Sequence, residues 1–238
     1  MSGAAVDRGF ARIGIVGLGL MGGSLARGLK ALGIAPHVAG FSLDPEDGRL
    51  ALEATAIDEL APDPSVAAAG RDLVVYATPL GVTLKLLREH SGVWGEAAVT
   101  DVVSLKSPIM GMMTDLGEAS RYVGSHPMAG GAASGFAAST GELFKNAPVW
   151  LVRGEGATRA ADGVEQLWRA LGSTPLWVDA VEHDARMTWV SHLPQLVANS
   201  LAAALANEGY TPSDLGPGGK DMTRLAASSP RRPKPSSL

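Results

Sequence analysis

Cysteine is absent from this chain of 238 residues, so disulfide bonds and thiolate catalysis are excluded. Uninterrupted apolar runs of about 18 residues are also missing, so we expect no membrane-spanning helix. Positive charge is not in excess, because the formal net charge is −4 and the basic residues are scattered. We therefore expect no nucleic-acid partner. These features favour a cytoplasmic protein whose length suffices for one sizeable domain and a smaller one.

Glycine is abundant, and its most informative cluster is the segment GLGLMGGS at positions 17–24. The segment follows an apolar run at 13–16 and leads into a leucine pattern of helical spacing. Strand, glycine turn and helix form the context in which G-x-G-x-x-G binds a dinucleotide. Gly17 permits the tight turn, Gly19 lets the backbone approach a pyrophosphate, and Gly22 lets helix and strand pack closely. The alternative is a glycine-rich turn that binds nothing.

Apolar runs of strand length alternate with helical patterns over most of the chain. We expect strands at 12–16, 37–42, 73–78, 98–102, 122–125, 149–152 and 175–178. We expect helices at 22–32, 46–53, 82–89, 107–116 and 157–171. Such alternation predicts an α/β fold with a doubly wound parallel sheet of the Rossmann type.

The pattern changes near Asp179, where one long helix is expected to run to Asn207 with a bend at Pro194. An apolar stripe marks one face of it, and a polar stripe that includes His192 and Gln195 either faces a cleft or is solvated. Residues 230–238 are rich in proline and basic residues, which is typical of a disordered tail. The predicted domains are a dinucleotide-binding domain at 1–178, a small, truncated all-helical substrate and dimerisation domain at 179–229, and the tail.

The end of the second predicted strand bears on cofactor choice. An acidic residue there favours NAD, and an arginine without the acid favours NADP. Ser42 occupies this position, and Asp44 either reaches the ribose or begins the next helix ahead of Pro45. Arg49 lies within that helix, so both NAD and NADP stay open.

Three further segments carry chemistry: TDVVSLK at 100–106, GSHPMAG at 124–130 and GGKDMTR at 218–224. Ser104 and His126 both fall at the carboxyl ends of predicted strands, where open α/β sheets bind their ligands. Imidazole accepts protons near neutral pH, so a Ser–His pair beside a nicotinamide can handle a substrate hydroxyl. Considered alone, a histidine such as His126 is more often a structural loop residue than a catalyst.

With these segments, the chain resembles the prephenate/arogenate dehydrogenases of tyrosine biosynthesis. The matching stretches are GLGLMGGSLA, DVVSLK, GSHPMAG, SGF, HD, SHLP and KDMTRLA, which occur in the family's order over roughly residues 11–229. The resemblance implies oxidative decarboxylation of a cyclohexadienyl substrate, with hydride transfer to the nicotinamide of NAD or NADP.

The resemblance also implies roles for single residues. His126 takes the proton of the ring hydroxyl, Ser104 orients His126 and the hydroxyl, and Arg224 anchors a substrate carboxylate. Arg224 could instead pair with Asp221, and Lys106 is either a packing or a loop residue and is left out of the catalytic set. The implied substrate-binding residues are Arg224, His192, Gln195 and Ala132; the implied cofactor-binding residues are Gly17, Gly19, Leu20, Met21, Gly22, Ser42, Thr78 and Pro79; no metal site is expected.

The chain also departs from the family pattern. Ala132 stands where many members have Glu, Gln195 where many have a second His, and Ser42 where NAD-preferring members have an acid. Because Gln195 removes a potential cation, we expect arogenate to be accepted as well as prephenate. A homodimer is implied, but the short C-terminus predicts weakened dimerisation and stability.

Two other functions are compatible with parts of the sequence. One is a different NAD(P)-dependent dehydrogenase that acts on a small hydroxy acid. The other is a catalytically inactive dinucleotide-binding protein.

Overall fold

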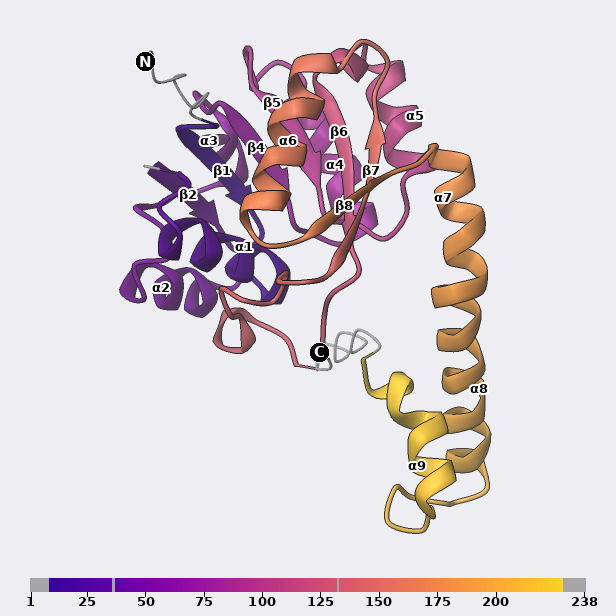
Figure 1. Ribbon diagram of the computed structural model, residues 1–238. Helices are drawn as coiled ribbons and strands as arrows, with labels where there is room; N and C mark the ends of the chain where they lie inside the picture. Colours follow the sequence, from indigo (N-terminus) through magenta and orange to yellow (C-terminus); the bar gives the residue numbers. More distant parts are fainter. Residues whose placement is uncertain (1–8, 36, 132, 229–238) are drawn as a thin grey trace, which may run out of the picture. The chain divides into compact units, whose positions relative to one another are not determined.

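Eight strands of the described residues form one sheet in the order β3-β2-β1-β4-β5-β6-β7-β8 (Figure 1). The computed structural model describes residues 9–35, 37–131 and 133–228. The strands are β1 Arg12–Val16, β2 His37–Phe41, β3 Glu59–Leu60, β4 Leu73–Tyr76, β5 Ala98–Asp101, β6 Tyr122–Pro127, β7 Pro148–Arg153 and β8 Thr174–Trp177. The helices are α1 Leu20–Ala31, α2 Pro45–Glu53, α3 Pro64–Ala68, α4 Leu80–His90, α5 Ser107–Asp115, α6 Thr158–Ala170, α7 Ala180–Met187, α8 Leu193–Asn207 and α9 Pro217–Thr223.

The prediction of a doubly wound Rossmann-type sheet is confirmed, with one correction to its direction. Strands β1 to β6 are parallel, but β7 pairs with β6 in the antiparallel sense, and β8 is parallel to β7. A parallel neighbour needs a long crossover, usually helical. The described part of the β6–β7 connection contains only the short 3-10 turn Phe136–Ala138, so β7 returns alongside β6.

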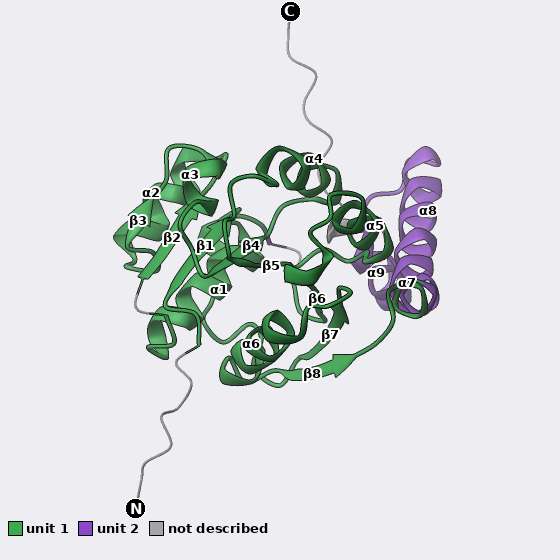
Figure 2. Cartoon of the chain, turned by 90° about the horizontal axis from the view of Figure 1, so that it is seen from above, with its two compact units in different colours: residues 1–130, 134–184 green, residues 131–133, 185–238 purple. Residues whose placement is uncertain are grey.

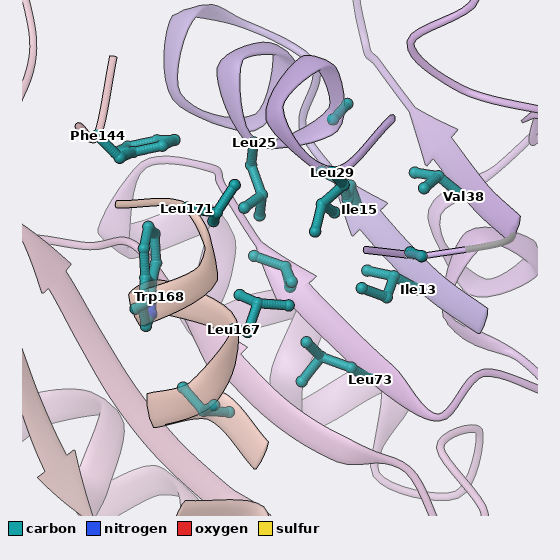
Figure 3. Close-up of a cluster of buried hydrophobic side chains, with 14 of the residues drawn as sticks. Ile13, Ile15, Leu25, Leu29, Val38, Leu73, Phe144, Leu167, Trp168 and Leu171 are labelled. Atoms are coloured by element: carbon teal, nitrogen blue, oxygen red, sulfur yellow. The ribbon is translucent and has the colours of Figure 1, made fainter. Parts of the chain in front are cut away.

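Alternation along the strands gives the sheet an apolar core on each face. Ile13 and Ile15 of β1 belong to one core, while Val16 belongs to the other. Figure 3 shows the first core, in which Leu25 of α1 and Trp168 of α6 lie over the same side of the sheet. The second core receives buried residues from α3, α4 and α5. Helices therefore cover both faces, which leaves the strand ends as the place for a ligand.

Among the short elements that the sequence pattern did not predict are α3, β3 and α9. Strand β3 has only two residues, Glu59 and Leu60, and therefore shows no apolar run. Helix α3 begins after Asp63, whose carboxylate accepts the backbone N–H groups of Ser65 and Val66. Elements this short are set by their tertiary contacts and caps, because they contain too few residues for a periodic pattern.

The chain divides into two compact units, which Figure 2 colours separately. The first comprises residues 1–130 and 134–184 and contains the sheet; the second comprises residues 131–133 and 185–238. The long helix predicted over 179–207 is interrupted by a π-helical segment, Thr188–His192. This segment directly precedes Pro194, which has no N–H to donate and whose ring crowds the carbonyl four residues earlier.

Candidate active site

The glycine turn after β1 has the geometry that a dinucleotide-binding turn requires. Gly17 adopts a φ of 106°, and a Cβ there would lie 2.5 Å from the carbonyl oxygen of Ala77. A Cβ on Gly22 would lie 1.8 Å from the carbonyl oxygen of Gly17, so helix and turn approach too closely for any side chain. At Gly19, by contrast, no described atom beyond its chain neighbours lies within 4 Å of a Cβ. The space beside Gly19 is therefore open.

The N-terminus of α1 suits an anion. Among the described residues, no side chain caps this helix, and its first turn contains no acidic residue. The N–H groups of the first helical turn have no partner within the helix, and the helix dipole adds partial positive charge. A pyrophosphate beside Gly19 would meet these N–H groups without displacing a side chain. The turn therefore fits the dinucleotide that the motif predicts.

The ends of three strands meet around this turn. The backbone N–H of Gly17 donates to the carbonyl of Phe41 at the end of β2, at 2.8 Å. Ser42 follows directly, so its predicted place beside the glycine turn agrees with the structure. At the end of β4, the Thr83 hydroxyl donates to the Thr78 carbonyl at 3.0 Å, which fixes the turn into α4. Thr78 and Pro79 thus stand at the same edge of the sheet as Ser42.

Asp44 and Arg49 are both held by neighbours within their own segment. The Asp44 carboxylate caps α2 by accepting the N–H of Glu46 at 2.9 Å. Arg49 forms ion pairs with Glu46 and Glu53 on the exposed side of the helix. Of the two roles left open for Asp44, the structure therefore shows the capping one.

His126 lies in β6, in the part of the sheet flanked by β5 and β7, and its side chain is buried. Its Nδ1 atom lies 2.9 Å from Nε2 of His183, a fully buried residue of α7. Nδ1 of His183 in turn lies 2.8 Å from Oδ1 of Asp184. The edge of the His183 ring also packs near Trp150 of β7, with ring centroids 6.5 Å apart.

Asp184 is held by the start of α5. Its two carboxylate oxygens accept the backbone N–H groups of Lys106 and Ser107, each at 2.8 Å. Burial opposes the charge of Asp184, but these hydrogen bonds and the one to His183 outweigh burial and lower the pKa of Asp184. Burial lowers the pKa of His183, against the opposing influence of Asp184. At neutral pH, Asp184 is therefore ionised and His183 is neutral.

Of the packing and loop roles left open for Lys106, the structure shows buried packing. Its fully buried ammonium pairs with Asp101 and donates to the carbonyl of Ser125 at 2.7 Å. Tyr122 donates its hydroxyl proton to the second oxygen of Asp101 at 2.6 Å. Burial lowers the pKa of Lys106 against the opposing pull of Asp101. This cluster ties the end of β5 to β6 directly before His126.

The remaining predicted site residues lie on separate segments. Ser104 is exposed on the loop after β5, and its contact with His126 stays a prediction. In the second unit, Gln195 donates to Asn199 at 2.9 Å and to the carbonyl of Leu225 at 2.8 Å, so Gln195 and the Arg224–Ser228 turn are neighbours. Ala132 lies outside the described residues.

His192 and Arg224 also belong to the second unit. His192 ends the π-helical segment and is half-buried. Arg224 follows α9, and within the described part of the chain no ion pair joins it to Asp221. The pairing with Asp221 considered from the sequence is therefore not formed.

The sequence analysis gave no role to His183 or Asp184, although the structure places both beside His126. The only feature of the sequence that could have indicated such a role is the dipeptide His183–Asp184 itself. His183 stands 57 positions after His126, and nothing in the local pattern indicates that α7 packs against β6 at this point.

The fold and the glycine turn are those of the Rossmann class, which binds dinucleotides at the carboxyl ends of its strands. Two family models match: "Prephenate dehydrogenase, nucleotide-binding domain" at residues 25–174, and "Prephenate dehydrogenase, dimerization domain" at residues 179–235. The chain therefore belongs to the prephenate dehydrogenase family.

Individual relatives agree with this family. The prephenate dehydrogenase of Bacillus subtilis is 34% identical over 230 residues, which are 91% of this chain and 60% of that protein. The chain thus spans about three fifths of that relative's length. A crystal structure of prephenate dehydrogenase from A. aeolicus with hydroxyphenyl propionate and NAD+ matches with a TM-score of 0.82 at 30% identity, covering 92% of this chain and 79% of that one. The Synechocystis arogenate dehydrogenase matches with a TM-score of 0.75 at 30% identity, covering 90% of this chain and 78% of that one.

Proposed function

We propose that this chain catalyses the NAD(P)-dependent oxidative decarboxylation of prephenate or arogenate, which yields 4-hydroxyphenylpyruvate or tyrosine. The observation that carries the proposal is the setting of His126. It lies in β6 of a dinucleotide-binding sheet, and its Nδ1 is held by His183. Membership of the prephenate dehydrogenase family and the open space at Gly19 support the same reaction.

A bound nicotinamide would supply the hydride acceptor. His126 takes the proton of the ring hydroxyl as hydride leaves the carbon that bears it. The ring carboxylate departs as carbon dioxide, and its bonding electrons complete the aromatic ring. His126 then returns the proton to the ring oxygen, so the net products are a phenol, carbon dioxide and the reduced cofactor. Because aromatisation drives the reaction, the chain mainly has to position groups and hold one proton.

The other site residues have supporting roles in this proposal. Ser104 orients the substrate hydroxyl toward His126. Arg224 binds a substrate carboxylate through its planar fork, and His192 lines the substrate pocket. Gln195 replaces a potential cation with an amide, which supports turnover of arogenate alongside prephenate.

NAD is the favoured cofactor within this proposal. A 2′-phosphate near Ser42 would meet the first turn of α2, which contains Glu46 and Asp47. Arg49, the cation of the same helix, is already paired with Glu46 and Glu53. The A. aeolicus relative was crystallised with NAD+.

Dimerisation is also part of the proposal. The model matched by residues 179–235 is described as a dimerization domain. The second unit exposes Trp189, Val190 and Leu196, which a second copy of the chain would cover. Because weakened dimerisation is expected from the sequence, light scattering over a concentration series should give a mass that rises from 24.4 kDa toward twice that value. A monomer at high micromolar concentration would contradict this part alone.

The test is formation of reduced cofactor by the purified chain, with prephenate and arogenate each offered alongside NAD and NADP. We expect turnover with both substrates, faster with NAD, and loss of turnover in His126→Asn. The matched control is His37→Asn, since His37 lies at the start of β2, far along the strand from the Ser42 edge. Absence of turnover with every pair, in a folded protein that binds NAD, would favour an inactive dinucleotide-binding protein.

A further inference from the structure

We propose that Asp184 and His183 act as positioning residues that fix the tautomer of His126, with the proton on Nδ1 and the accepting lone pair on Nε2. This inference rests on the proposed function for its consequence in catalysis. Its structural content, the protonation pattern of three adjacent side chains, can be tested without any ligand.

The carboxylate of Asp184 can only accept hydrogen bonds when it is ionised. Two backbone N–H groups, of Lys106 and Ser107, point at it from the start of α5. Its pKa is lowered, so it is ionised throughout the neutral range. Nδ1 of His183, 2.8 Å from Oδ1 of Asp184, must therefore carry a proton and donate it.

The next step follows from the neutral state of His183. Neutral imidazole carries one N–H, and here that N–H is on Nδ1. Nε2 of His183 is then an acceptor, and the nitrogen 2.9 Å away, Nδ1 of His126, must be the donor. A neutral His126 with its proton on Nδ1 has an unprotonated Nε2, which is the form a general base needs.

The surroundings keep this chain of hydrogen bonds in place. His183 is fully buried, and Trp150 of β7 packs edge-on near its ring. The charged groups that act on His183 are Asp184, Lys106 and Asp101. Lys106 and Asp101 form a buried ion pair with each other, and Asp184 is the charged group that hydrogen-bonds to His183. When His126 gains a proton, its Nδ1–H still donates to His183, and the Asp184 charge stabilises the imidazolium through the intervening ring.

A simpler role for His183 would be to satisfy buried polar atoms without affecting His126. The two roles differ in what they predict for the nitrogen atoms of His126. Long-range proton–nitrogen NMR spectra of 15N-histidine-labelled protein distinguish protonated from unprotonated ring nitrogens. The chain has five histidines, so single substitutions assign each signal.

Two substitutions at His183 separate the roles. His183→Gln can keep a carbonyl acceptor near the position of Nε2, whereas His183→Met fills similar space with only a weak acceptor. We expect Nδ1 of His126 to be protonated in the parent chain and in His183→Gln, and the two tautomers to be mixed in His183→Met. With prephenate and NAD, kcat should fall about 10- to 100-fold in His183→Met and recover largely in His183→Gln, with KM little changed. His37→Gln should remove only the signals of His37 itself and leave the His126 signals and kcat unchanged.

An unprotonated Nδ1 on His126 in the parent chain would overturn the inference, even if His183→Met failed to fold. So would an unchanged tautomer in a folded His183→Met. If the spectra match the expectation but no substrate is turned over, the tautomer assignment holds and the proposed function fails. The two failures are therefore distinguishable.

Discussion

The buried ammonium of Lys106 donates to the backbone carbonyl of Ser125, the residue directly before His126, at 2.7 Å. A charge at the start of α5 thereby supports the strand that carries the proposed base. The same ammonium pairs with Asp101, which also accepts the N–H of Val103 in the loop leading to Ser104.

Replacing Lys106 with Met should destabilise the chain by about 3–5 kcal/mol, because Asp101 would be left as an unpaired buried charge. Urea denaturation measures the loss. The combined variant Lys106→Met, Asp101→Asn should lose less than the sum of the two single variants, since neither buried charge then remains. Lys85→Met, at an exposed position of α4, is the control and should behave like the parent. If Lys106→Met lost no more stability than Lys85→Met, the buried ion pair would not support the fold.

Gly19 and Gly22 should respond differently to alanine. Gly22→Ala places a Cβ against the backbone of Gly17 and should lower the melting temperature, because backbone atoms must move. In Gly19→Ala, the added Cβ contacts no described atom, and the φ of −68° at this position is ordinary for alanine. The melting temperature should therefore stay the same. The added methyl group instead enters the space assigned to the pyrophosphate and should weaken NAD binding roughly tenfold or more. Calorimetric titration with NAD measures this, and unchanged affinity in Gly19→Ala would contradict the placement of the cofactor.

Stability should fall as the pH drops below about 6.5. Burial lowers the pKa of both His90 and His183 from 6.5, so between that value and their folded pKa the unfolded chain binds more protons than the folded one. The contribution of these two histidines to the free energy of unfolding is therefore complete above pH 6.5 and is lost as the pH falls through this window. Urea denaturation at pH 7.5, 6.5 and 5.5 measures the slope.

His90→Gln provides the matched variant for this slope. Its carbonyl can still accept the Tyr76 hydroxyl, which lies 2.8 Å from Nδ1 of His90 in the parent chain. The variant cannot take up a proton, so its stability should depend less steeply on pH. Equal slopes in parent and variant would mean that His90 does not contribute.

Cofactor preference should shift when the acidic side chains around Arg49 are neutralised. Glu46→Gln with Glu53→Gln removes both ion-pair partners of Arg49 and one negative charge from the first turn of α2. We expect the ratio of kcat/KM for NADP over NAD to rise roughly two- to fivefold, as is typical for one charge near an exposed helix N-terminus. Lys145→Gln, which removes an exposed ion pair with Glu142 beyond β6, is the control. A ratio that falls or stays constant would argue against placing the ribose beside α2.

The predictable parts of this protein are those in which local pattern decides structure. The run from β1 through the glycine turn to α1 and β2 follows from apolar spacing and glycine positions within about 30 residues. The direction of β7 does not, because a single strand carries no signal for parallel or antiparallel pairing. The contact of His126 with His183 cannot be predicted from the local sequence either, because it depends on how α7 packs against β6. The sequence predicts a bend at Pro194, and the structure has a π-helical segment in the turn before this proline, a form that the sequence pattern does not indicate.

Among the described helices, none has the length and apolar character needed to cross a membrane. The sequence leads to the same expectation, because its apolar runs are short.

The first turn of α5 has an unusual origin. Among the described residues, its own N-cap position, Lys106, provides no side-chain acceptor, and the acceptor comes instead from Asp184, 77 and 78 positions further along the chain. During synthesis on the ribosome, the N–H groups at the start of α5 therefore lack this acceptor until the segment that contains Asp184 has been made. A nascent chain that ends before α7 contains the residues of the glycine turn and of β6 but lacks the carboxylate that accepts the first N–H groups of α5. The start of α5 therefore depends on a contact of high sequence separation, whereas the glycine turn is built from residues close together in the chain.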